Sequence, residues 1–374
     1  MTEKIHTKNS NLHDNLRAFV QKKIAGRNLS SQNNFPLELW KKMGKQGFLA
    51  FGIPEQYGGC GGGFLSISKA CKILVENSCC PGLGASFMVH HLSACFALSG
   101  FGTENQKQTY LPGIAKGKIT ASVAMSEPET GAHPRYMRTT AKPDKGGYLI
   151  TGEKTYLTNA PFADIFFTMA VSGKKGDKNL ITAFIIQKKT PGLSVTAPIH
   201  LDFLKPAPHG GIIIKDCSLP ESSILGRKDH AYLDIIKPFR EIEDVLMMGI
   251  GLGAMECQLK FMAEMVKNTH MKKEMSAYLG RFKSIITALT VIAHKAASLL
   301  DNGLSPNEVT ELVIAFKLWA KNAQDIVDKI LSQTKHKIPD KLEIITRDLK
   351  MAGSIAANIT LNKEKKLGLK LAEI

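Results

Sequence analysis

Apolar and polar residues follow two different periods in the first two thirds of the chain. Up to about residue 118 the apolar positions recur at helical spacing, as at Leu37, Trp40, Met43 and Phe48. From about 119 to 228 the pattern changes to short runs rich in β-branched and aromatic residues, separated by Gly, Pro, Asn and Lys turns. This change predicts an N-terminal helical domain at 1–118 and a middle β domain at 119–228.

The helical period returns in the last third of the chain. Three long segments carry it, at roughly 232–268, 277–300 and 306–334. The pattern therefore predicts a C-terminal helical bundle at 229–374. Together the three regions make an α+β protein whose element order is α, then β, then α.

Composition supports a folded protein and limits its environment. Of the 374 residues, 44% are apolar and 22% are charged, which is typical of a globular chain and excludes a disordered or fibrous one. Apolar runs are broken before the roughly 18 residues that a membrane span needs, and the N-terminus lacks the apolar core of a signal peptide. We expect no membrane span and a soluble, cytoplasmic protein.

The cysteine and histidine patterns argue against a disulfide framework or a metal site. The seven cysteines are an odd number and contain no CxxC spacing, so we predict neither disulfides nor zinc and expect a reducing cytoplasm. His90 and His91 are adjacent on a predicted helix, so their side chains point apart, and a core role is favoured over metal binding.

The chain is strongly basic, with a formal charge of +16. Such a field favours acidic ligands or partners, among them nucleic acid, an anionic cofactor or an acidic carrier protein. The sequence has no basic motif interleaved with aromatic residues, so we expect no nucleic-acid binding. It also lacks a P-loop, an HExxH and a G-x-S-x-G, and these observations alone leave the function open.

Four motifs in register narrow the choice. They are FGTENQKQTYLPGIAKGK (101–118), AMSEPETG (124–131), GYLITGEKTYLTNAPFAD (147–164) and PESSILG (220–226). In this order they resemble the acyl-CoA dehydrogenase family, and the resemblance runs from about 35 to 253. It implies FAD held between the middle and C-terminal domains, usually across a subunit interface, and hence a homodimer or homotetramer. It also implies an acyl thioester substrate and an electron acceptor such as an electron-transfer flavoprotein.

The resemblance assigns flavin contacts to two motifs. By position, Met125 and Ser126 lie against the flavin, Tyr156 supplies an aromatic ring packed on it, and Thr158 supplies a hydroxyl near its N5 atom. This is physically reasonable because an aromatic face buries flavin area and neutral donors stabilise charge on the reduced ring.

The resemblance also bears on the base that removes the substrate α proton. The position of the common family base holds Ala356, nine residues beyond Arg347. A smaller branch, which includes isovaleryl- and long-chain acyl-CoA dehydrogenases, places its Glu on the first long C-terminal helix, and this register lands on Glu243. Glu243 shares a helical stripe with Met247, Ile250 and Ala254, so burial should raise its pKa. The alternative is a surface ion pair with Arg240.

Several positions depart from the family pattern and leave two functions open. The departures are Ala132, His133, Asp244, the segment 269–273 and the segment 332–335. Lys272, Lys273, Lys335 and Lys337 are candidates to neutralise a pyrophosphate, although Lys lacks the bidentate geometry of Arg. The first hypothesis is an FAD-dependent enzyme that introduces an α,β double bond into an acyl thioester of CoA or an acyl carrier protein. The second is a catalytically silent subunit of a hetero-oligomer.

Overall fold

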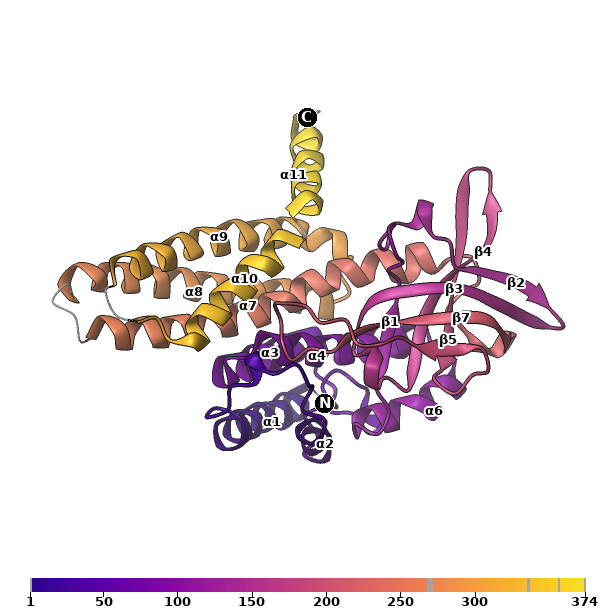
Figure 1. Cartoon of the computed structure of the whole chain (residues 1–374), viewed down its shortest axis with the longest axis horizontal. Coiled ribbons are helices and arrows are strands. Elements are labelled where there is room, and N and C mark those ends of the chain that lie inside the picture. Colours follow the sequence, from indigo (N-terminus) through magenta and orange to yellow (C-terminus); the bar gives the residue numbers. More distant parts are fainter. Residues whose placement is uncertain (1, 268–271, 335–336, 356, 373–374) are drawn as a thin grey trace.

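The structure is a computed structural model that describes residues 2–267, 272–334, 337–355 and 357–372. For 2–10, 272, 306 and 307 it describes the backbone only. Helices come first along the chain, a β-sheet follows, and helices return to the C-terminal end (Figure 1). The predicted α+β class and the order of its three regions are confirmed.

The N-terminal region is a group of helices beneath the C-terminal ones in Figure 1. Its α-helices are α1 (Thr2–Lys23), α2 (Leu37–Lys45), α3 (Gly63–Ser78), α4 (Pro81–Leu92), α5 (Ser99–Phe101) and α6 (Glu104–Ala115). Local sequence explains two of the starts. Pro81 occupies the first turn of α4, where a missing N–H costs nothing. At α6, Thr103 and Gln106 form a capping box in which each side chain bonds the other residue's backbone N–H.

The middle region is an eight-stranded sheet. Its strands are β1 (Ala121–Ala124), β2 (Thr140–Asp144), β3 (Gly147–Thr158), β4 (Ile165–Lys175), β5 (Lys178–Gln187), β6 (Leu193–Val195), β7 (His209–Pro220) and β8 (Ile224–Leu225). They lie in the order β6-β7-β3-β2-β4-β5-β8, and β1 pairs in parallel with β4. Lys145 and Gly146 both have positive φ in the two-residue β2–β3 turn, as tight hairpins with right-handed twist require. Buried Phe166, Phe184 and Ile212 form part of the core of this region.

The C-terminal region contains the long helices that the sequence pattern predicts. After the π-helical turn η7 (Tyr232–Ile236) come α7 (Lys237–Lys267), α8 (Lys272–Asp301), α9 (Thr310–Gln333), α10 (Asp340–Ile355) and α11 (Ala357–Ala372). The first three lie side by side and α10 crosses them, whereas α11 stands away from the body of the molecule (Figure 1). The sequence pattern predicts three long helical segments up to about residue 334, and it does not separate α10 and α11 as individual helices.

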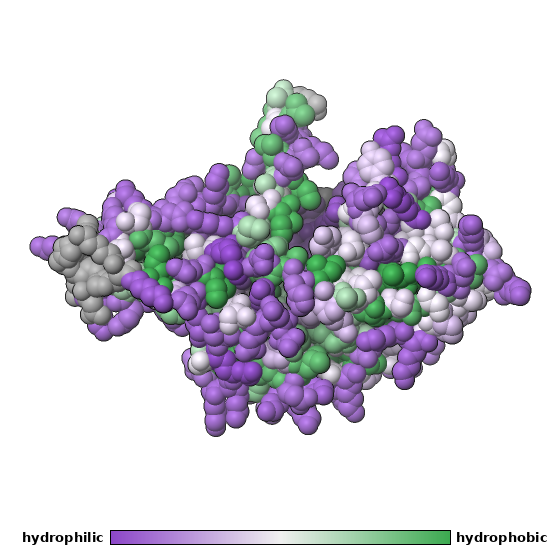
Figure 2. Space-filling model, viewed as in Figure 1, coloured by the Kyte–Doolittle hydropathy of each residue, from purple (hydrophilic) through white to green (hydrophobic). Residues whose placement is uncertain are grey.

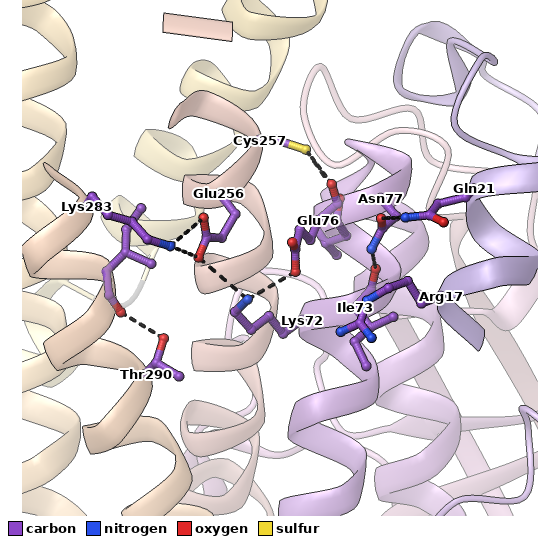
Figure 3. Close-up of polar contacts among 12 residues, drawn as sticks. Arg17, Gln21, Lys72, Ile73, Glu76, Asn77, Glu256, Cys257, Lys283 and Thr290 are labelled. Atoms are coloured by element: carbon purple, nitrogen blue, oxygen red, sulfur yellow. Dashed lines mark hydrogen bonds and ion pairs between the residues drawn. The ribbon is translucent and has the colours of Figure 1, made fainter. Parts of the chain in front are cut away.

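The helix that carries Glu243 packs closely on the N-terminal region. A Cβ atom on Gly253 of α7 would lie 2.6 Å from the carbonyl oxygen of Lys72 on α3, so only glycine permits this approach. Ion pairs surround the contact: Lys72 lies 3.0 Å from Glu76 and 3.7 Å from Glu256, which Lys283 of α8 also reaches at 2.9 Å (Figure 3). The α3–α7 contact thus fixes α7 relative to the rest of the fold.

The structure corrects the prediction that the chain has no disulfide. Cys79 and Cys257 are joined, with their Cα atoms 5.9 Å apart. Cys257 lies one helical turn beyond Gly253 on α7, and Cys79 ends α3 in the left-handed conformation, so the close helix approach brings the two together. The sequence hides this pair because 178 residues separate the two cysteines.

The expectation that the chain has no membrane span can be compared with a test of whether any helix is long and apolar enough to cross a membrane. By length and composition alone, Tyr232–Lys267 and Lys273–Asp301 meet that test. In the first segment, 67% of the apolar window is buried inside the protein, as in the core helix of a globular fold. The two helices are weak evidence for a membrane span, because a core helix passes the same test.

The two adjacent histidines take the core role that the sequence analysis favoured. Both are fully buried, and each has a ring nitrogen bonded to a backbone carbonyl, His90 to that of Leu49 and His91 to that of Phe87. Burial lowers the pKa of His90 to about 4 and that of His91 to about 3, so both are neutral near pH 7. Among the described residues, no group of three or more His, Cys, Asp or Glu side chains is placed to hold a metal ion.

Candidate active site

A cavity of about 1280 Å³ lies between the β-sheet and the C-terminal helices. The ends of β1 and β3 line one wall, α7 lines another, and α9 and α11 contribute residues from the C-terminal side. We call this space the interdomain cavity. The five residues predicted to contact the flavin or to act as the base all line it: Met125, Ser126, Tyr156, Thr158 and Glu243.

A β-bulge presents Tyr156 to the interdomain cavity. In the β3–β7 ladder, Lys154 pairs with Ile212 and Leu157 with Gly210, so β3 contains one extra residue between these pairs. Tyr156 has a φ of 57° there, which is unusual for a bulky residue, and its side chain is 61% exposed. The backbone is thus distorted at a position where a tyrosine faces an open cavity, which points to a function.

Thr158 has a defined hydrogen-bond partner that the sequence analysis did not identify. Its hydroxyl lies 3.3 Å from Nε2 of His209, while Nδ1 of the same ring lies 3.0 Å from the carbonyl of Ala207. Burial lowers the pKa of His209, so the ring is neutral and Nδ1–H donates to the carbonyl. Nε2 then accepts from the Thr158 hydroxyl, whose oxygen keeps its lone pairs for a ligand.

A buried ion pair joins strand β3 to the segment that follows β1. Lys154 of β3 donates to the Glu127 carboxylate at 2.8 Å and to the Met125 carbonyl at 3.2 Å, and both side chains are almost fully buried. Burial opposes ionisation of Glu127, but Lys154 and backbone donors outweigh it and hold the carboxyl pKa below its usual range. Thr155 N–H also donates to the Ser126 carbonyl at 2.9 Å. Glu127 and Lys154 both lie in motifs of the family pattern, but nothing in the sequence indicates that their charges are buried as a pair.

Glu243 lies on α7, half-buried, at the wall of the interdomain cavity. Burial raises the pKa of its carboxyl to about 7, and the neighbouring Asp244 raises it further, while Arg240 and Lys317 act in the opposite direction. Among the described residues, no hydrogen bond or salt bridge joins Glu243 to Arg240, although the charge of Arg240 lowers the pKa of the Glu243 carboxyl. A carboxylate in this state suits a general base.

Asp244 faces a different set of partners. Its two carboxylate oxygens lie 2.8 Å from Lys317 of α9 and 2.9 Å from Lys363 of α11. Lys363 also lies 2.6 Å from Glu241. These ion pairs tie α11 to α7 beside the interdomain cavity and explain how α11 keeps its place although none of its residues is buried.

Comparison with known proteins identifies this arrangement. Residues 7–118 match the model of the acyl-CoA dehydrogenase N-terminal domain, and 122–217 match that of the middle domain. The probable acyl-CoA dehydrogenase YngJ of Bacillus subtilis is 31% identical over 255 residues, which cover 67% of both chains. The chain belongs to the acyl-CoA dehydrogenase family. A Serratia dehydrogenase of L-prolyl-peptidyl-carrier protein is 35% identical over 52% of this chain and 51% of its own.

Solved structures agree in fold over nearly the whole chain. The prolyl acyl carrier protein oxidase AnaB has a TM-score of 0.86 at 23% identity, covering 97% of this chain and 98% of its own. The FAD complex of PigA has a TM-score of 0.84 at 24% identity, with the same coverage. The curated relatives named above match this chain over between about half and two thirds of their own length.

PigA, which shares this fold, is known in complex with FAD. The interdomain cavity fits this group in three respects: it is large, it offers the exposed ring of Tyr156, and it offers hydroxyls at Ser126 and Thr158. An aromatic ring exposed in a cavity is suited to packing against a flat ligand ring.

Other positions from the sequence analysis fall in different places. Ala132 and His133, which depart from the family pattern, line the interdomain cavity. Of the candidate pyrophosphate lysines, Lys273 and Lys337 do not belong to the described lining, and Lys337 pairs with Asp340 at 3.9 Å. Lys335, Ala356, the side chain of Lys272 and residues 269–271 lie outside what the structure describes.

Proposed function

We propose that the protein oxidises an acyl thioester to its α,β-unsaturated product, with Glu243 as the base. The observation that carries this proposal is a half-buried carboxylate, with its pKa raised to about 7, on the same cavity as Tyr156 and Thr158. A carboxylate with a pKa near 7 is about half ionised at pH 7, and it is basic enough to take a proton from carbon.

In this proposal each group of the chain has one role. Glu243 takes the α proton of the thioester, and the β hydrogen leaves as a hydride, so the substrate loses two electrons and gains a double bond. Bound FAD supplies the electron acceptor for that hydride. Tyr156 would hold the ring system of bound FAD by its aromatic face, and Met125, Ser126 and Thr158 would hold the rest of the ring. His209 orients the Thr158 hydroxyl.

The thioester carrier is CoA or an acyl carrier protein. Both are anionic, which suits a chain of charge +16 and a cavity lined by Lys237, Arg240 and three lysines of α11, Lys363, Lys366 and Lys370. The relatives include enzymes named for CoA and for carrier-protein substrates, which supports both classes. An electron-transfer flavoprotein is the proposed acceptor that reoxidises the cofactor.

Changing Glu243 to Gln tests the base. The amide keeps the shape of the side chain but cannot accept the proton, so reduction of bound flavin by substrate should fall roughly 100-fold or more, while FAD content persists. Stopped-flow absorbance of the flavin measures this rate. Glu311→Gln is the matched control because Glu311 is an exposed carboxylate on the same cavity, and this change should leave the rate within about twofold of the parent.

Two outcomes would contradict the proposal. If the Glu243→Gln variant reduces flavin as fast as the parent, the base is another residue. If the parent binds FAD but no acyl thioester of CoA or a carrier protein reduces the flavin, the silent-subunit alternative replaces it.

We also propose that the working form is a homodimer or homotetramer. Large apolar side chains are exposed on the outer faces of the C-terminal helices, including Val291, Leu318, Trp319, Leu369 and Leu371. Figure 2 shows apolar surface on the projecting α11 and on the body beside it. Such exposure is typical of a subunit contact. Light scattering that gives a monomer mass with and without FAD would contradict this.

A further inference from the structure

We propose that Lys366 and Lys370 of α11, together with Lys237 at the start of α7, bind phosphate groups of the ligand in the interdomain cavity. The inference rests on the proposed function, because it takes FAD and a thioester carrier as the ligands. It adds a phosphate subsite formed by side chains that the motifs did not single out. The pyrophosphate of FAD is the first candidate and the phosphates of CoA are the second.

One stripe of α11 that lines the cavity changes from apolar to basic along the helix, with Lys363 and Leu367 beside it. Ile359, Asn362, Lys366 and Lys370 are spaced by three or four residues, so they share one face, and all four line the cavity. From Ile359 to Lys370 the helix rises roughly 16 Å. A ligand with a flat ring or an acyl chain at one end and phosphates at the other has the same order of polarity.

The charges of these lysines are available to a ligand. Lys363, the next lysine on this face, is half-buried and already paired with Glu241 and Asp244. Lys366, Lys370 and Lys237 are exposed, and within the described ranges none of them is hydrogen-bonded or ion-paired. Unpaired ammonium groups on a cavity wall attract a phosphate ester and bond to its oxygens.

A purely structural role predicts different behaviour. Lysines in the last turns of a helix also stabilise the helix dipole, and Lys370 lies in the last turn of α11. In that case removing the charge of Lys365 should have the same effect as removing that of Lys366, because both are exposed on the same helix. Lys365, however, is not part of the cavity lining. The pair Lys366→Gln and Lys365→Gln therefore separates ligand binding from net charge and from helix stability.

The first experiment measures flavin binding to the apo-protein by fluorescence at low salt. For Lys366→Gln and Lys370→Gln, the dissociation constant of FAD should rise about tenfold each, the lower end of what a hydrogen bond to a charged group contributes. Riboflavin, which has no phosphate, should bind the variants and the parent equally. Lys365→Gln should bind both flavins like the parent. Thermal unfolding followed by circular dichroism should be the same for all three variants.

The second experiment locates the phosphate if FAD binding does not change. Calorimetry on the FAD-loaded protein compares CoA with pantetheine, which lacks the phosphates. A loss confined to CoA in Lys366→Gln and Lys370→Gln would assign the subsite to the thioester carrier. The proposal is overturned if neither FAD relative to riboflavin nor CoA relative to pantetheine is affected, or if Lys365→Gln has the same effect. Failure of the parent to bind FAD would instead overturn the proposed function itself.

Discussion

The basicity of Glu243 depends on a few neighbours. Burial is the main cause of its raised pKa, and the adjacent Asp244 adds to it, while Arg240 and Lys317 oppose it. Asp244 is itself paired with Lys317 and Lys363, which moderates its effect without removing it. A change at Asp244 would itself alter the pKa of Glu243. Glu311→Gln is therefore a better control than Asp244→Asn for the Glu243→Gln variant.

The pH dependence of flavin reduction should follow from this arrangement. The base works when ionised, so the rate constant should rise with pH through about 7, the pKa of Glu243. Asp244→Asn removes a like charge, and the rising limb should move to lower pH. Rapid-mixing measurements from pH 5 to pH 9 on parent and variant, at constant ionic strength, test this. A limb that stays in place, or moves to higher pH, would contradict the assignment.

Functional residues could be predicted from the sequence only where they lie in a recognisable motif or pattern. Tyr156, Thr158 and Glu243 came from family motifs and from an apolar stripe, and all three line the interdomain cavity. His209 was missed because it reaches Thr158 across the β3–β7 ladder, 51 residues along the chain. The Glu127–Lys154 pair was missed because nothing in the sequence shows that these two charges are buried together. The roles assigned to the predicted residues stay predictions.

At the scale of elements, the α3–α7 contact depends on glycine. Gly253 faces the backbone of α3, whereas Gly251, on the same helix, faces only the Phe316 ring at 3.8 Å. Helical periodicity predicted that α7 exists but not which of its faces meets another helix at such close range. The bulge at Tyr156 was unpredictable for a similar reason, since an extra residue in one strand is defined only by its partner strand.

Alanine at these two glycines should therefore have different effects on the free energy of unfolding. Gly253→Ala should lower the free energy of unfolding by about 1–3 kcal/mol, because the methyl group would overlap the carbonyl of Lys72 and the side chain of Val75. Gly251→Ala should be neutral or raise it by up to about 1 kcal/mol, since alanine favours the helix and space is available. Urea denaturation measures both. Equal destabilisation by the two changes would refute the close contact.

At the scale of the whole molecule, the Cys79–Cys257 bond joins the N-terminal helices to the C-terminal bundle. Disulfide bonds persist mainly in oxidising compartments. The prediction of a reducing cytoplasm rested on the expected absence of disulfides, so the structure removes its support. The cytoplasmic location stays a prediction, as do the domain boundaries after residues 118 and 228. The order of the three regions could be predicted from the sequence, whereas the covalent link between two of them could not.

The disulfide can be tested by counting thiols. The denatured protein should react with a thiol reagent at five cysteines before reduction and, with the bridged pair released, at seven afterwards. Cys79→Ser should lower the free energy of unfolding by about 2–4 kcal/mol under oxidising conditions, because the unfolded chain loses a constraint. Cys60→Ser, at a half-buried cysteine outside the disulfide, should cost much less. Seven reactive thiols without reductant would disprove the bond.

The same bond divides the chain mechanically. The entire β-sheet and the first part of α7 lie inside a covalent ring, and the two ends of the chain are tails attached to it. A force applied to the termini would extend the tails while the ring between Cys79 and Cys257 stayed closed. Cutting the bond would release about 60 nm of additional contour length from its 178 residues. The cavity walls formed by β1, β3 and the start of α7 would thus be shielded from tension that pulls α8 to α11 apart.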